Sequence, residues 1–140
     1  MPIPIASDHA GFELKQFIIS HFKDFHWRDE GCYSLESVDY PDFAHKVAAC
    51  ISEHPEEKGV LICGSGNGMQ MAANKHPNVR AALCWDKEIA ALARTHNDAN
   101  ILVMPARFIA KEEAIEICNA FFGTSFEGGR HEKRVVKING

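Results

Sequence analysis

The sequence lacks the residue spacings by which small proteins hold zinc ions or disulfide frameworks. Its five cysteines form no CxxC pair, and they are scattered along 140 residues, at Cys32, Cys50, Cys63, Cys84 and Cys118. An odd number of scattered cysteines is typical of a reducing compartment, so we expect a cytoplasmic protein. The formal net charge is −4, and this lack of a basic excess argues against a nucleic-acid partner. No signal peptide or membrane-spanning run is visible, so we expect no membrane partner.

Two familiar nucleotide-binding motifs are also missing. Residues 64–68 read GSGNG, which lacks the last spacing of the dinucleotide motif GxGxxG. The same stretch lacks the Gly-Lys-Ser/Thr of a P-loop. These absences argue against a dinucleotide-dependent oxidoreductase.

The stretch from Gly59 to Lys75 organises the rest of the chain. Its apolar run Val60-Leu61-Ile62 is typical of a strand buried on both faces, and a helix is expected from Met69 onward. Three glycines alternate with polar residues between them, which leaves backbone N–H groups open to a ligand, and such groups at a helix start favour negative charge. Cys63 stands at the strand end, where ligands bind in open α/β sheets. The alternative is a tight turn without a ligand.

Length and patterning predict a single α/β domain that spans residues 1–140. Five short apolar segments alternate with helical patterns, which indicates a parallel sheet covered by helices on both faces. The expected strands are 2–6, 25–30, 60–62, 79–84 and 101–104. The expected helices begin near positions 12, 40, 69, 87 and 111, and a last helix is expected near the C terminus.

Polar side chains follow four of the expected strands. They are Asp8-His9, the stretch 63–68, Trp85-Asp86 and Arg107. Because the carboxyl ends of parallel strands meet at one edge, a crevice there would hold a carboxylate, an imidazole, a thiol, a hydroxyl and a guanidinium. Taken singly, each residue can instead be a helix cap or a solvated loop residue.

Two further features lie outside that edge. Arg130 and Arg134 are spaced i, i+4, so on a helix they would share a face and grip one phosphate, or else form a solvated basic face. His96 precedes a strand instead of following one. By topology it should therefore lie at the opposite edge from Cys63.

Six motifs occur in an order and spacing that carry a family resemblance. They are SDHAG at 7–11, DYP at 39–41, CGSGNG at 63–68, ANK at 73–75, HNDAN at 96–100 and EGGRH at 127–131. The set resembles the type B ribose-5-phosphate isomerases, whose wider family includes galactose-6-phosphate isomerase subunits. The resemblance implies a Rossmann-like α/β/α sandwich with no metal and no organic cofactor. It also implies interconversion of ribose 5-phosphate and ribulose 5-phosphate in the non-oxidative pentose phosphate pathway.

The resemblance also assigns roles to residues. One family branch uses a cysteine base where this chain has Cys63, and the other uses a glutamate where it has Met69, so this chain resembles the cysteine branch. Ser65 would relay a proton between O1 and O2, His96 would open the sugar ring, and Asp8 would assist at the sugar hydroxyls. The expected substrate-binding residues are His9, Tyr40, Gly64, Gly66, Asn67, Gly68, Asn97, Arg107, Arg130 and Arg134. The turn and the adjoining helix start are expected to lower the thiol pKa from about 8.5.

The predicted distance between His96 and Cys63 has a consequence for assembly. Ring opening and enolisation must occur on one small sugar, so we expect a homodimer with the site at the subunit interface, as the resemblance also implies. Two alternatives remain open. One is an isomerase of a hexose 6-phosphate such as allose or galactose, and the other is a non-catalytic phosphosugar-binding module. The second predicts loss of the base or of the ring-opening group, yet both are present.

Overall fold

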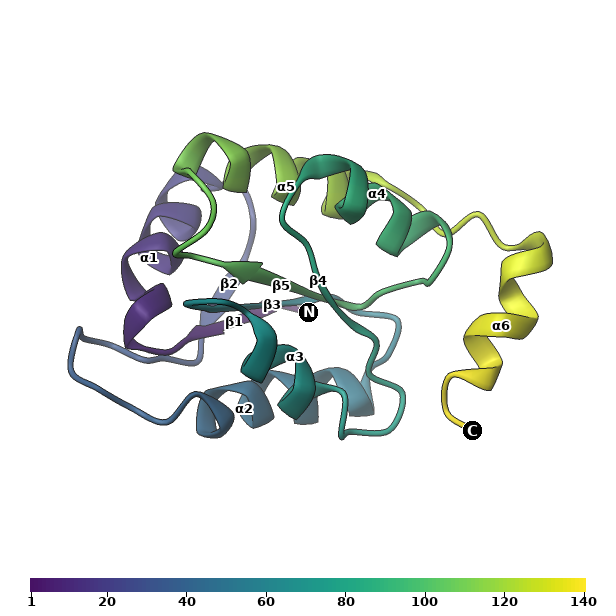
Figure 1. Cartoon of the computed structure of the whole chain (residues 1–140), viewed down its shortest axis with the longest axis horizontal. Coiled ribbons are helices and arrows are strands. Elements are labelled where there is room, and N and C mark those ends of the chain that lie inside the picture. The colour runs from purple at the N-terminus through teal and green to yellow at the C-terminus, as the bar shows by residue number, and fades with distance from the viewer.

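A five-stranded sheet lies between two layers of helices in the computed structural model, which describes residues 1–140 (Figure 1). The strands are β1 (Ile3–Ser7), β2 (Trp27–Asp29), β3 (Gly59–Cys63), β4 (Ala81–Leu83) and β5 (Ile101–Pro105). The α-helices are α1 (Phe12–His21), α2 (Tyr40–Glu53), α3 (Asn67–Ala73), α4 (Lys87–Thr95), α5 (Lys111–Gly123) and α6 (Glu132–Lys137). Two short 3-10 helices, η1 (His9–Gly11) and η2 (Gly129–His131), precede α1 and α6.

Every pair of neighbouring strands is parallel, and the strand order is β2-β1-β3-β5-β4. The predicted parallel sheet is therefore confirmed. All five residues of the central strand β3 are buried, as its apolar run predicts. The strand order reverses between β1 and β3, because the chain runs outward to β2 and then returns on the other side of β1. Ligands of open α/β sheets bind at the carboxyl ends of strands at such a point.

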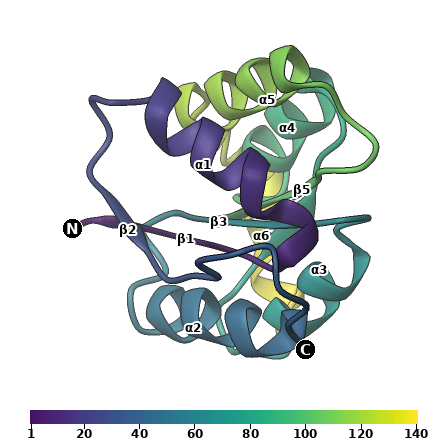
Figure 2. The ribbon, with the colours of Figure 1, turned by 90° about the vertical axis from the view of Figure 1, so that its left-hand side faces the viewer.

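Helices cover both faces of the sheet. α1, α4 and α5 lie on one face, and α2 and α3 lie on the other (Figures 1 and 2). Along β3, Val60 and Ile62 pack into the first layer, whereas Leu61 and Cys63 pack into the second, as the two-residue period of a strand requires. None of the helices is both long and apolar enough to cross a membrane.

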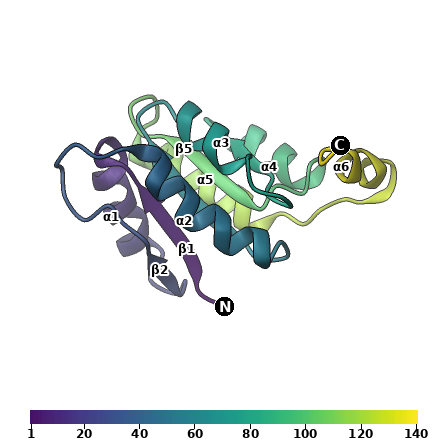
Figure 3. The ribbon, with the colours of Figure 1, turned by 90° about the horizontal axis from the view of Figure 1, so that it is seen from below.

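The structure differs from the predicted elements at the sheet edges and in the tail. Both edge strands, β2 and β4, are shorter than predicted, because each pairs with a neighbour on one side only. The prediction that one regular helix carries Arg130 and Arg134 is wrong, because Arg130 belongs to the 3-10 turn η2 before α6. Figures 1 and 3 both place α6 at the end of the molecule opposite α1.

Gly11 marks a close approach between η1 and β3. A Cβ atom at this position would lie 2.5 Å from the carbonyl oxygen of Ile62, a main-chain atom that cannot move without disturbing β3. We expect Gly11→Ala to reduce the free energy of unfolding by about 1–3 kcal/mol in a urea titration. Gly123→Ala is the matched control, since a Cβ there would have nothing within 4 Å. Equal stability of the two variants would contradict the close approach.

Candidate active site

A cleft of about 410 Å³ opens at the carboxyl ends of β1, β3 and β5. It is lined by Asp8, His9, Ala10, Tyr40, Cys63, Gly64, Ser65, Gly68 and Arg107. The carboxylate, imidazole, thiol, hydroxyl and guanidinium that were predicted to meet at this sheet edge therefore do so. The prediction that Trp85 and Asp86 join them is wrong. Asp86 instead caps α4 by accepting a hydrogen bond from the Ile89 N–H at 2.9 Å, and β5 separates its strand from β3.

A larger cavity, of about 770 Å³, lies beside α3, α4 and the last residues of the chain. Its lining includes Asn97 and Ile138, but it contains no thiol, hydroxyl or carboxylate side chain. The smaller cleft holds the groups that acid–base chemistry needs, so we place the candidate active site there.

Main-chain hydrogen bonds hold the three loops of the cleft together. The Asp8 N–H donates to the Ile62 carbonyl at 3.3 Å, which joins the loop after β1 to β3. The N–H groups of Ala106 and Arg107 donate to the carbonyls of Cys63 at 2.8 Å and Gly64 at 3.0 Å, which joins the loop after β5 to the glycine-rich turn. The Asp8 side chain also caps η1, because its Oδ1 accepts from the Gly11 N–H at 3.0 Å.

The glycine-rich turn wraps around the Cys63 thiol. Cys63 is the last residue of β3 and is 4% exposed, and its Sγ accepts a hydrogen bond from the Gly66 N–H at 3.2 Å. Gly66 has φ of +81°, a left-handed conformation that favours glycine. Ser65 is exposed beside the thiol, and its Oγ accepts from the Asn67 N–H at 3.3 Å.

Burial raises the pKa of the Cys63 thiol above its ordinary value of 9.0. The nearby Asp8 carboxylate also raises this pKa, whereas the backbone N–H groups of Met69, Gly66 and Ser65 lower it. The prediction that the glycine-rich turn lowers the pKa overall is therefore wrong, because the loss of water around the sulfur outweighs the amide donors. In the free chain at neutral pH the thiol form dominates.

The raised pKa of Cys63 predicts how alkylation should depend on pH. Only the thiolate reacts, so we expect the rate of Cys63 alkylation by iodoacetamide to keep rising as the pH passes 9. Rates resolved for each cysteine by mass spectrometry separate Cys63 from the half-buried Cys50. An alkylation rate of Cys63 that levels off below pH 8 would show that the amide donors lower the thiol pKa more than burial raises it.

The rest of the cleft presents hydrogen-bond donors and a flat ring. His9 accepts the Val38 N–H on Nδ1 at 3.2 Å, so the neutral ring carries its proton on Nε2. The Arg107 guanidinium lies over Gly64, where a Cβ would come within 3.2 Å of its Nη1. The Tyr40 ring rests on Gly68, where a Cβ would come within 2.3 Å of the ring.

Six of the predicted site residues do not line this cleft. They are Gly66, Asn67, His96, Asn97, Arg130 and Arg134. Gly66 and Asn67 belong to the glycine-rich turn beside the cleft, whereas the other four lie elsewhere. His96 follows the last residue of α4 as its C-terminal cap, Asn97 lines the larger cavity, and both arginines are exposed near the C terminus. This separation agrees with the topological prediction for His96, and it extends that prediction to the tail arginines.

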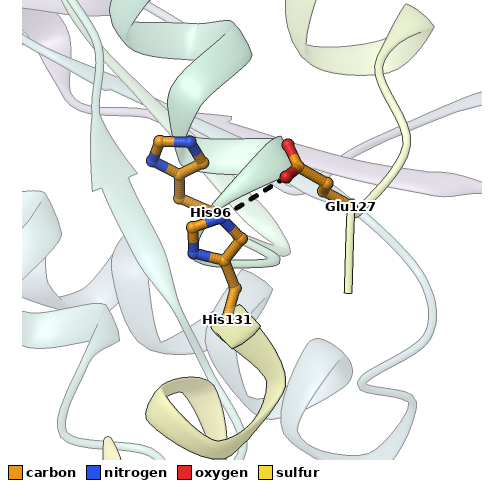
Figure 4. A group of neighbouring side chains, drawn as sticks. All are labelled: His96, Glu127 and His131. Carbon is orange, nitrogen blue, oxygen red and sulfur yellow. Dashed lines mark ion pairs between the residues drawn. The ribbon is translucent and has the colours of Figure 1, made fainter. Parts of the chain in front are cut away.

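Sequence reasoning missed the surroundings of His96. Its ring stacks on that of His131, with the ring centroids 4.3 Å apart and an angle of 16° between the planes. Glu127 reaches toward His131 from the preceding loop, with 3.7 Å between Oε1 and Nε2 (Figure 4). Burial lowers the pKa of His131, and His96 and Arg130 lower it further. Glu127 and His131 are four residues apart, but Glu127 lies in a loop and His131 in the 3-10 turn η2, so helical spacing gave no signal for this contact.

Comparison with known proteins shows which family the chain matches. The family model described as Ribose/Galactose Isomerase matches residues 3–138. A probable ribose-5-phosphate isomerase B from Mycoplasma pneumoniae is 48% identical over 140 residues, covering 98% of this chain and 92% of the relative. The ribose-5-phosphate isomerase B of Escherichia coli is 40% identical over 138 residues, covering 97% and 93%.

Solved structures agree with these matches. A ribose 5-phosphate isomerase from Thermotoga maritima has a TM-score of 0.95 at 50% identity, with 99% of this chain and 97% of that chain covered. Ribose-5-phosphate isomerase B from Mycoplasma genitalium, with bound ribulose-5-phosphate, has a TM-score of 0.94 at 45% identity, with 99% and 93% covered. This chain therefore belongs to the ribose/galactose isomerase family.

Proposed function

We propose that this protein is a ribose-5-phosphate isomerase that interconverts ribose 5-phosphate and ribulose 5-phosphate through an enediolate, in the non-oxidative pentose phosphate pathway. The observation that carries the proposal is the Cys63 thiol at the end of β3, in one cleft with the Ser65 hydroxyl and the glycine-rich turn. The relatives named ribose-5-phosphate isomerase, which match over nearly the full chain, support the choice of substrate.

Enolisation needs a base that moves one proton between C2 and C1 and donors that stabilise the enediolate. Cys63 supplies the base in its thiolate form, which is the minor form at neutral pH, and Ser65 relays the second proton between O1 and O2. The N–H groups of Gly66 and Asn67 are already engaged by the thiol and the hydroxyl, so other N–H groups of the turn, such as that of Gly68, face the enediolate. The second carboxylate oxygen of Asp8 and the Tyr40 hydroxyl contact the sugar.

The phosphate needs cations and fixed donors. His9 and Arg107 bring a ring N–H and a guanidinium to the cleft of the same chain. Arg130 and Arg134 are exposed and lie outside that cleft, so their guanidinium groups are free to bind a phosphate held elsewhere.

We infer that the active unit is a homodimer with two shared sites. One cleft contains Cys63 but lacks His96, Asn97 and both tail arginines, and a two-fold axis supplies all four from the second chain. The exposed apolar side chains Val136 (68%) and Ile138 (53%) near the C terminus favour a partner on the same segment. His96 of the partner then opens the sugar ring, and Asn97 contacts the sugar.

An isomerisation assay on ribose 5-phosphate, without added metal or nicotinamide, tests the proposed function. We expect turnover to ribulose 5-phosphate, and the assay repeated on allose 6-phosphate should give a lower kcat/KM. A higher kcat/KM on the hexose phosphate would assign that sugar, instead of ribose 5-phosphate, as the substrate. Absence of turnover on both sugars would favour the phosphosugar-binding module.

The tail arginines should act on substrate affinity. Arg134→Lys keeps the charge but loses the bidentate fork, so we expect KM for ribose 5-phosphate to rise on the order of tenfold, with kcat little changed. Arg130→Lys should behave alike. The matched control is Lys133→Gln, which removes a charge from an exposed position of the same helix. An unchanged KM in both lysine variants would remove these residues from the phosphate site.

A further inference from the structure

We propose that His96, Glu127 and His131 form a binding site for one divalent transition-metal ion such as Zn²⁺, and that an ion held there inhibits the isomerase. The binding part rests on the geometry of the chain itself, and the inhibitory part rests on the proposed function of His96. The ion is not needed for the isomerisation.

The three side chains converge at the junction between α4 and the C-terminal segment. Each offers one ligand atom, and these atoms all lie within 4.8 Å of one another. Figure 4 shows the two imidazole rings side by side and the Glu127 carboxylate directed at the His131 ring. Two imidazole nitrogens and one carboxylate oxygen are a ligand set that zinc accepts with a fourth position open to solvent.

An unsatisfied nitrogen gives independent evidence for a ligand. His131 is 4% exposed, and its Nε2 has no hydrogen-bond partner. The Oε1 atom of Glu127 faces this nitrogen at 3.7 Å, which is beyond hydrogen-bond distance. A buried nitrogen without a partner costs free energy, and a metal ion between it and the carboxylate would remove that cost.

The main chain holds the three ligand residues in place. The Glu127 N–H donates to the carbonyl of Thr95, the residue before His96, at 3.1 Å. The buried Arg94 adds a second tie, because its Nε donates to the Thr124 carbonyl at 3.1 Å. The loop before η2 is therefore fastened to the end of α4, so the backbone that carries the three ligand residues is already in place.

Small side-chain movements complete the coordination. Bonds of about 2.0–2.2 Å to a tetrahedral zinc ion bring ligand atoms to roughly 3.4 Å from one another, so the present spacing must contract. The nitrogen lone pairs lie in the ring planes, so those of two stacked rings point in parallel directions and do not meet at one ion. One ring must therefore turn. His96 is only half-buried, whereas His131 is fixed in the interior, so His96 is the ring that turns.

The ligand types select the class of ion. Imidazole nitrogen favours zinc, copper, nickel and cobalt, whereas magnesium and calcium prefer sites made of oxygen ligands. A zinc ion on the His96 nitrogen occupies the lone pair that ring opening uses. Inhibition should therefore be strongest with substrate presented as the closed ring.

Titration of zinc chloride into the chelator-stripped full-length protein, followed by calorimetry, tests the site. We expect one zinc ion per chain whose affinity falls by at least about 10–100-fold in His131→Gln, Glu127→Gln and His96→Gln, since losing a ligand costs no less than losing an outer-sphere contact. Glu127 is exposed, so its variant tests the site without disturbing the interior. Magnesium chloride should give no binding in any variant.

His45→Gln is the matched control. His45 and His76 form another surface histidine pair, with 2.8 Å between Nδ1 and Nε2, where zinc could bind instead. We expect His45→Gln to keep the wild-type affinity. Absence of zinc binding, or an affinity that depends on His45 and not on Glu127 and His131, would overturn the site.

The inhibitory part has its own readout. Zinc at saturating concentration should slow the isomerisation of ribose 5-phosphate by wild-type and His45→Gln protein, and chelation should restore the rate. Glu127→Gln should need at least tenfold more zinc for the same inhibition. Zinc binding that leaves the rate unchanged would overturn the inhibitory part and keep the site. Because calorimetry needs no turnover, a failure of the proposed function would not be confused with a failure of the metal site.

Discussion

Replacing Cys63 with alanine is expected to lower kcat for ribose 5-phosphate by about 10²–10⁴-fold, the usual contribution of a positioned general base. The thiol lies in the cleft at the end of the central strand, and its sulfur accepts a hydrogen bond from the Gly66 N–H of the glycine-rich turn. The substitution leaves the groups proposed to hold the phosphate unchanged, so KM should change little. Steady-state kinetics with ribose 5-phosphate measure both constants.

Two controls separate the chemistry of Cys63 from its packing. Cys84→Ala removes another buried thiol, one that does not line the cleft, and it should keep near-normal kcat. A stoichiometric thiol reagent should inactivate the wild-type enzyme, and ribose 5-phosphate should protect it. Near-normal turnover of Cys63→Ala would refute Cys63 as the base.

Mixing the inactive variants Cys63→Ala and His96→Ala is expected to restore about a quarter of the active sites. In a mixed dimer with shared sites, one site carries both defects and the other carries neither. Random exchange makes about half of the dimers mixed, so about one site in four recovers. The measurement is the specific activity after subunit exchange, with ring-closed substrate so that ring opening limits the rate.

The matched control mixes Cys63→Ala with Ser65→Ala. These two residues line the same cleft of one chain, so every site of a mixed dimer keeps one defect and no activity should return. Native mass spectrometry of a tagged variant verifies the exchange. If the first mixture fails to recover after verified exchange, the shared site is refuted, and His96 is left as a structural residue or a catalyst within one chain.

The central features of the fold were predictable because local and global preferences agree there. The run Val60-Leu61-Ile62 is apolar on both sides, so it predicts a doubly covered strand, and the glycines after it predict the turn at its end. The cleft followed from topology, since parallel strands bring Asp8, Cys63 and Arg107 to one edge.

Features that depend on three-dimensional surroundings were not predictable. The pKa of Cys63 reflects its burial against the sheet, which the turn sequence does not encode. Asp86 follows a strand as Asp8 does, but its strand, β4, is an edge strand that lies outside the cleft. The sequence does not reveal the order of the strands in the sheet. The stacking of His131 on His96 joins residues separated by a strand and a helix, so periodicity gives no sign of it.

The distance between His96 and the cleft of its own chain also bears on how activity scales with protein level. On the proposed shared site, a chain that has folded alone holds a base without a ring-opening group. Dimer formation is second order, so at concentrations well below the dissociation constant the number of complete sites grows with the square of the chain concentration. A cell that makes half as many chains in that range would keep about a quarter of the flux, whereas above it the loss would be about half.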